Sequence, residues 1–193
     1  MAIRRKISES DLKAIQNYLA ATAVGPSTVR SYPGDTLITT RQFLGKLQLQ
    51  ALANKPADSF PQYLSILSRR LKVKLAALSS ANENDDYFGI SRKVINIFLH
   101  NAYYNRYLCG RFELDRFEDQ FEIPIDSRTA KAIRSRAIKS GEAFPAQIPP
   151  PWKTIKALTP STHAEYQRAA LAIAQQQGTK RVHLDAYFWP SIG

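Results

Sequence analysis

Apolar residues recur every three or four positions along most of this 193-residue chain, and this spacing restricts the fold more than any other feature. In the stretch SFPQYLSILSRRLKVKLAALS, one face of a helix would carry Leu64, Leu67, Leu71 and Leu78. No stretch alternates convincingly between apolar and polar residues, as a half-buried strand would. The sequence therefore predicts an all-α protein.

Capping residues and the same periodicity give the order of the expected helices. Proline at a first turn and glycine just past the end mark one long helix, from Pro160 to Gly178. The other predicted helices lie near 9–22, 40–53, 60–79 and 91–108, in the stretch DSRTAKAIRSRAIK, and in LDAYFW. We expect one domain over 1–193, built as two helical lobes with a cleft between them. Its amino-terminal helical part would cover about 1–80, and its second part about 81–193.

The rare residue types bear on the cellular compartment. A single cysteine, Cys109, leaves no intramolecular disulfide and no cysteine metal cluster, which fits a reducing compartment. The three histidines, His100, His163 and His183, are too scattered for a metal site. No apolar run approaches the roughly 20 residues that span a bilayer, and MAIRRKISES lacks the apolar core of a secretory signal. We expect a cytoplasmic monomer with no metal, no cofactor and no membrane partner.

The charge balance indicates the kind of partner. The chain carries 27 basic and 16 acidic side chains, a net charge of +11 and a pI near 9.9. A positive field of this size favours a polyanion, because each neutralised phosphate releases a condensed counterion. The alternative is a basic protein whose charge serves only solubility. We predict a nucleic-acid partner, and specifically double-stranded DNA in the nucleoid.

The stretch GISRKVIN combines glycine with two adjacent basic residues at the start of an apolar run. We expect Gly89 in a tight turn whose free amides lead into a helix amino terminus, an arrangement that binds phosphate. Lys93 would then lie in the first turn of that helix, where its amine could act as a nucleophile. The alternative is that Lys93 is an ordinary surface lysine.

A second stretch, FEIPIDSRTAKAI, places Asp126 after an apolar segment and at the start of a helix. A helix cap is the commonest role for such an aspartate. Together, however, GISRK and IPID resemble two motifs of the helix–hairpin–helix superfamily of DNA glycosylases, in which a glycine hairpin precedes a catalytic lysine and an essential aspartate follows. The 33 residues from Lys93 to Asp126 make the chain most similar to the archaeal 8-oxoguanine branch.

A third stretch, HLDAYFW, offers Asp185 and Trp189 at the spacing that this branch uses to line its base pocket. The alternative is an amphipathic terminal helix that packs its aromatic residues into the core. One departure is Ser91, which stands where the second hairpin glycine would be. The resemblance covers about residues 85–193 and implies three groups of site residues. They are Lys93 and Asp126 for catalysis, Asp185 and Trp189 for the base, and Gly89, Ser91, Arg92 and Arg128 for DNA.

The resemblance implies base excision, in which a base is flipped out of DNA and its N-glycosidic bond is broken. If Lys93 attacks the sugar, a Schiff base forms and strand cleavage by lyase chemistry follows; if water attacks, only an abasic site results. Oxidised guanine is the leading substrate, which would make the protein a DNA repair enzyme. A hydroxymethylated or glucosylated cytosine in phage DNA is the other, which would make it an antiviral defence enzyme. The competing class is a non-enzymatic DNA-binding protein in which the hairpin grips phosphate and Asp126 only caps a helix.

Overall fold

The computed structural model describes residues 7–78 and 86–188, and within these ranges every regular element is helical. The all-α prediction is therefore confirmed. The amino-terminal group of helices comprises α1 (Glu9–Ala23), α2 (Pro26–Val29), α3 (Thr36–Gly45), α4 (Gln50–Ala53), α5 (Phe60–Ala76), α6 (Phe88–Tyr104) and α7 (Arg106–Phe112). The carboxyl-terminal group comprises α8 (Ser127–Ser140), α9 (Pro160–Gln176) and α10 (Leu184–Phe188).

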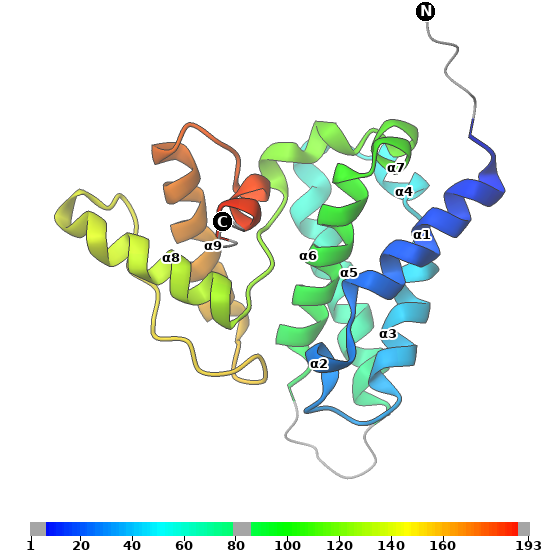
Figure 1. The fold of residues 1–193 in the computed structure, drawn as a ribbon, viewed down its shortest axis with the longest axis horizontal. Helices are drawn as coiled ribbons and strands as arrows, with labels where there is room; N and C mark the ends of the chain where they lie inside the picture. The colour runs from blue at the N-terminus through cyan, green and yellow to red at the C-terminus, as the bar shows by residue number, and fades with distance from the viewer. Residues whose placement is uncertain (1–6, 79–85, 189–193) are drawn as a thin grey trace, which may run out of the picture.

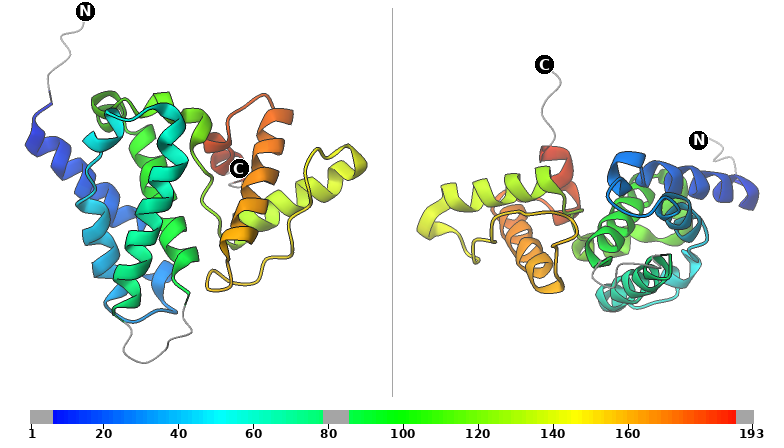
Figure 2. Two further views of the ribbon diagram at one scale, coloured as in Figure 1. Left: turned by 180° about the vertical axis from the view of Figure 1, so that it is seen from behind. Right: turned by 90° about the horizontal axis from the view of Figure 1, so that it is seen from below.

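The two groups lie side by side, as all three views in Figures 1 and 2 show. In the amino-terminal group, α1, α3, α5 and α6 pack against one another. In the carboxyl-terminal group, α8 packs on α9, and α10 packs on α8. An extended segment, residues 121–126, runs between the groups and leads into α8 (Figure 1). Because α6 also contacts α9, this segment passes along the junction of the two groups.

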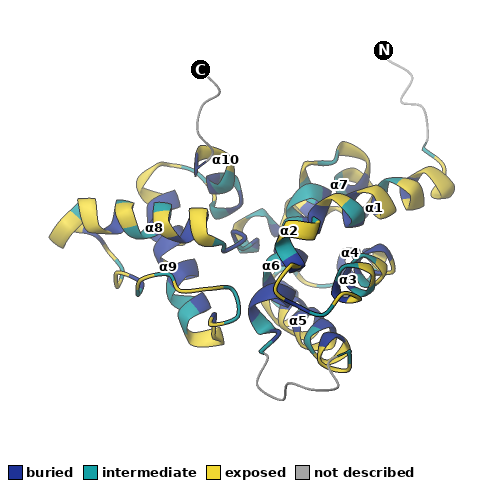
Figure 3. Ribbon diagram, turned by 60° about the horizontal axis from the view of Figure 1, so that its bottom comes forward, coloured by how far each residue is buried: buried dark blue, intermediate teal, exposed yellow. Residues whose placement is uncertain are grey.

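The buried apolar residues fall into two clusters, and Figure 3 shows the corresponding buried faces turned inward on both groups. The first cluster is formed by residues between Leu12 and Phe121, with Val182, and is dominated by leucine. The second cluster is formed by residues between Ile123 and Phe188, and many of its members are alanine. The division between the clusters lies after Phe121, whereas the sequence suggested a division near residue 80.

Most predicted helices are present with bounds close to those expected, but two predictions of extent are wrong. The stretch 40–53 contains two helices, α3 and α4, separated by a turn at Lys46–Leu49. The helix predicted over 91–108 begins earlier, at Phe88, and ends at Tyr104. Asn105 breaks it because its side chain accepts hydrogen bonds from the backbone N–H groups of Tyr107 and Leu108, and so caps α7.

The tight turn predicted at Gly89 is also wrong, because Gly89 is the second residue of α6 and has an ordinary helical conformation. Glycine is nevertheless required at position 89, for a steric reason. A Cβ atom there would lie 2.1 Å from the carbonyl oxygen of Ile155, so only glycine allows the segment before α9 to approach α6 this closely. Gly89 thus belongs to the contact between the two groups of helices.

Candidate active site

The structure brings Lys93 and Asp126 together from different elements. Lys93 projects from the first turns of α6, and Asp126 ends the extended segment before α8. The Lys93 Nζ atom lies 3.6 Å from Asp126 Oδ2. The lysine side chain is 15% exposed and the aspartate side chain 40%, so the pair is sheltered yet reachable from solvent. An amine and a carboxylate are therefore paired at the rim of the junction.

The two carboxylate oxygens of Asp126 have different partners. Oδ1 accepts hydrogen bonds from the backbone N–H groups of Arg128 and Thr129, each at 3.0 Å, and so caps α8. Oδ2 faces the ammonium of Lys93. The capping role and the charge-pairing role therefore coexist in one side chain, and the cap fixes the direction in which Oδ2 points.

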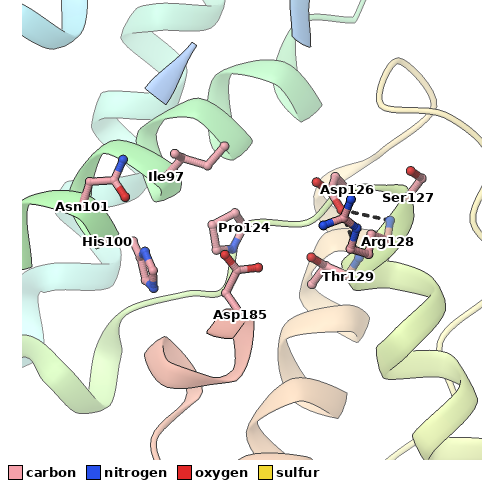
Figure 4. A pocket seen from close by; sticks show the side chains of 9 residues that line it. All are labelled: Ile97, His100, Asn101, Pro124, Asp126, Ser127, Arg128, Thr129 and Asp185. Carbon is pink, nitrogen blue, oxygen red and sulfur yellow. Dashed lines mark hydrogen bonds between the residues drawn. The ribbon is translucent and has the colours of Figure 1, made fainter. Parts of the chain in front are cut away.

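Asp126 also lines a pocket of about 450 Å³ between α6, α8 and α10 (Figure 4). The lining residues are Ile97, His100, Asn101, Pro124, Asp126, Ser127, Arg128, Thr129 and Asp185. Asp185 comes from α10 and enters the pocket beside Pro124, away from the α8 end that carries Asp126 and Arg128. Pockets of this volume accommodate small organic molecules or a single extruded base. The cavity thus brings together Asp126, predicted to act in catalysis, and Asp185, predicted to bind the base, whereas Lys93 is not one of its lining residues.

His100 is a pocket residue that the motifs did not indicate. Its Nε2 lies 3.0 Å from the carbonyl oxygen of Val182, and burial lowers the pKa of its imidazole although the Asp185 carboxylate raises it. The spacing of residues along α6 could have indicated His100 as a residue of the site. Lys93, Ile97 and His100 follow one another at intervals of four and three, so they lie on one face of α6. A neutral imidazole therefore lies on the same helix face as Lys93, two turns further along.

The residues predicted to bind DNA through a hairpin do not lie in a hairpin but within helix α6. Gly89, Ser91 and Arg92 are buried within α6, so no phosphate reaches them in this structure, which corrects that prediction. The Ser91 hydroxyl is buried and has no hydrogen-bond partner among the described residues. Arg128 is exposed and lines the pocket, as a DNA-contacting residue would. Trp189 and residues 79–85 lie outside the described residues.

Arg92 takes part in a buried ion pair at the junction. Its guanidinium donates two hydrogen bonds to the Glu122 carboxylate, at 2.7 and 2.6 Å. Burial opposes ionisation of Glu122, but the hydrogen bonds from Arg92 prevail and hold its pKa down at about 2. His163 of α9 lies 3.5 Å from the same carboxylate, and burial lowers the pKa of its imidazole to about 4. At neutral pH the contact is therefore one of a carboxylate with a neutral imidazole.

Comparisons with known proteins add no relative. No protein-family model matches the chain, and neither a curated protein nor a solved structure matches it. None of the described helices is both long and apolar enough to cross a membrane. Within residues 7–78 and 86–188, no three histidine, cysteine or acidic side chains gather as metal ligands would. The function is therefore inferred from the motifs and the geometry of the site.

Proposed function

We propose that this protein is a DNA glycosylase similar to the helix–hairpin–helix superfamily in its lysine and aspartate, although Gly89 lies within α6 and forms no hairpin turn. The single observation that supports this most is the Lys93–Asp126 pair, 3.6 Å apart, beside a pocket of about 450 Å³. These two residues are the ones that the motifs assign to catalysis, and 33 positions separate them in the chain. A helix cap alone explains neither the lysine nor the pocket.

In the proposed reaction a base rotates out of the duplex into the pocket, since its glycosidic bond cannot be reached inside the stack. Breaking that bond develops positive charge on the sugar. The Asp126 carboxylate would stabilise this charge, because a fixed, sheltered negative group acts strongly on a developing cation. The Lys93 ammonium would first give up a proton to solvent, and its amine would then attack the anomeric carbon as the base leaves with the glycosidic electron pair. The lysine-bound sugar would then open its ring, as the C1′–O4′ bond breaks and O4′ takes up the proton lost from the lysine nitrogen, to give a Schiff base. This Schiff base would permit strand cleavage by elimination, whereas attack by water would leave an abasic site.

Positive charge next to the pocket supports DNA as the substrate. Helix α8 contains no acidic residue, and its basic residues are Arg128, Lys131, Arg134, Arg136 and Lys139. This helix begins at the pocket, so phosphates flanking an extruded base would lie along it. We expect duplex affinity that falls steeply as salt is raised, because several phosphates are neutralised. Affinity that stays unchanged between low and physiological salt would exclude this mode of binding.

The identity of the base is the finer part of the proposal. Asp185 would accept hydrogen bonds from the donor edge of the extruded base, and His100 and Asn101 give the same wall further polar groups. Oxidised guanine is our first choice, and hydroxymethylated or glucosylated cytosine is the second. The first substrate would assign the protein to DNA repair, and the second to defence against phage in the cytoplasm.

The decisive experiment incubates the protein with duplexes that carry single defined lesions, and with normal and modified phage DNA, followed by alkali. We expect Asp126→Asn to lower the single-turnover excision rate by about 1,000-fold, because an amide keeps the cap but loses the charge. Lys93→Gln should abolish borohydride trapping and lower excision by about 100-fold or more if the lysine is the nucleophile.

A matched control is the exposed pair Lys180 and Asp119, whose charged atoms lie 2.5 Å apart and which does not line the pocket. Lys180→Gln and Asp119→Asn should leave excision unchanged. Excision at the parent rate by Lys93→Gln would identify water as the nucleophile. Full activity of Asp126→Asn would show that Asp126 only caps α8 and would reject the resemblance on which the assignment rests. No excision by the parent with any substrate would reject the glycosylase and leave the non-enzymatic DNA-binding protein.

A further inference from the structure

The extended segment before Asp126 is fixed by side chains from both groups of helices. Arg181 donates hydrogen bonds to the carbonyl oxygens of Gln120 and Phe121, at 3.0 and 2.8 Å. The buried side-chain amide of Gln167 makes two hydrogen bonds to the backbone of Ile123. Its Oε1 accepts from the Ile123 N–H at 3.2 Å, and its Nε2 donates to the Ile123 carbonyl oxygen at 2.7 Å. The backbone that leads to Asp126 therefore has little freedom to move along the junction.

Glu122, like Asp126, is a side chain of this segment that reaches α6. Besides the two hydrogen bonds from Arg92, its Oε2 accepts one from the Asn96 amide at 3.0 Å. Arg92 in turn donates to the Ser68 hydroxyl of α5 at 3.2 Å. The side chains of Arg92 and Glu122 are only 8% and 13% exposed, so water cannot replace these bonds. The segment is thus joined to α6 by a planar, bidentate contact that permits one geometry.

The two residues of this ion pair are close in sequence to the two proposed catalytic residues. Arg92 immediately precedes Lys93 on α6, and Glu122 precedes Asp126 by four residues in the segment. The Lys93–Asp126 pair itself is looser, at 3.6 Å, and more exposed than the Arg92–Glu122 pair at 2.6 Å. The buried pair, rather than the catalytic pair, therefore sets the distance between the two elements.

We propose that Glu122 is a positioning residue that acts through Arg92 and Asn96 to hold Asp126 opposite Lys93. This proposal rests on the proposed function, since it concerns the same two catalytic groups. Small displacements of reacting groups, on the order of 1 Å, are enough to lower a rate by about 100-fold. A buried ion pair has a large desolvation cost and can often be replaced by apolar residues without loss of stability. Such a replacement separates a role in geometry from a role in folding.

The test is therefore the double substitution Arg92→Met with Glu122→Leu. We expect this variant to unfold within a few degrees of the parent and to bind duplex DNA with affinity within about twofold. Its single-turnover excision rate should fall by about 10- to 100-fold, because the apolar contact no longer fixes the direction of the segment. The matched control replaces the exposed pair Arg111 and Glu9 in the same way, and should excise at the parent rate.

A folded double variant that excises at the parent rate overturns the proposal. Should the double variant fail to fold, Glu122→Asp keeps the charge and removes one methylene. A lowered rate with unchanged affinity then supports positioning, and the parent rate overturns it. A readout that does not depend on the reaction is the NMR signal of the Lys93 amine after the lysines are methylated with an isotope-labelled reagent. The Lys93→Arg variant lacks this signal and so identifies it in the spectrum. If the parent excises no base, the proposed function fails, while an unchanged Lys93 signal in a folded Glu122 variant separately overturns the positioning role.

Discussion

The two hydrophobic clusters achieve burial with different residues. The first is built mainly of leucine and large aromatic side chains, including Phe60, Phe98 and Phe117, which are fully buried. The second has alanine at many positions, so α8 and α9 approach closely while each residue removes less apolar surface from water. The alanines are Ala130, Ala137, Ala169, Ala170, Ala172 and Ala174. The first group of helices is therefore stabilised by its own core to a greater extent than the second.

This difference in apolar burial gives the buried polar contacts between the two groups of helices a larger part in holding the second group in place. The buried charged and amide side chains of the junction, Arg92, Glu122, His163 and Gln167, join the alanine-rich group to the leucine-rich group. Apolar contacts are non-directional, whereas hydrogen bonds between buried groups permit one arrangement. The comparison thus separates apolar burial, which is greatest in the first cluster, from directional polar contacts, which are concentrated at the junction. The following predictions test that separation.

The largest losses of stability are expected for two substitutions at the junction, Glu122→Gln and Gly89→Ala, of which the second alters the steric contact between the groups. The added methyl carbon would lie 2.1 Å from the Ile155 carbonyl oxygen, and backbone cannot yield as a flexible side chain can. We expect the free energy of unfolding to fall by about 3 kcal/mol or more. Urea denaturation measures this change.

The matched control is Gly110→Ala, at an exposed position of α7 where an added Cβ would meet nothing within 4 Å. Alanine favours a helix over glycine by about 1 kcal/mol, so this variant should be neutral or slightly more stable. Equal stability of Gly89→Ala and the parent would show that the two groups are free to separate at this contact, and that Gly89 serves another purpose.

How much of this arrangement could be predicted depends on the range of each signal. The helices α1, α5, α8 and α9 follow from local periodicity and from caps within a few residues, such as Thr159 and Asp126. The meeting of Lys93 with Asp126 was expected only from the resemblance, because no local rule relates residues 33 positions apart. The Arg92–Glu122 pair was missed because a basic residue near a glycine suggested a phosphate site. Only tertiary packing shows that Arg92 points into the junction.

A second prediction uses pH to weaken the junction while leaving the first cluster intact. The pKa of His163 is about 4 in the folded protein, against about 6.5 in the unfolded chain, because burial opposes its charge and outweighs the attraction of Glu122. The unfolded state therefore binds more protons between these values, and stability falls as pH falls. Between pH 7.5 and pH 5 the loss should be about 2 kcal/mol.

Thermal unfolding at a series of pH values measures this loss, and His163→Gln should remove most of it. Burial also lowers the pKa of His100, so a smaller loss of the same sign should remain in that variant. Glu122 adds a further loss only below about pH 4.5, as pH approaches its folded pKa of about 2. A parent protein whose stability is constant from pH 7.5 to pH 5 would contradict a neutral, buried His163.

The smallest effect is expected for an ion pair of the first group that lies at the surface. Lys72 and Asp86 have charged atoms 2.8 Å apart, but their side chains are 44% and 39% exposed. Asp86 also accepts a hydrogen bond from the Phe88 N–H at the start of α6, and an amide oxygen can keep that bond. Asp86→Asn therefore removes the charge pair alone and should lower the free energy of unfolding by less than about 1 kcal/mol.

Glu122→Gln, which neutralises one partner of the buried pair, should lower the free energy of unfolding by about 3 kcal/mol or more in the same urea assay, because the Arg92 charge is left buried without its counterion. Similar losses of unfolding free energy for the two variants would mean that the buried ion pair of the junction contributes no more than an exposed one, and the distinction between the junction and the surface would fail.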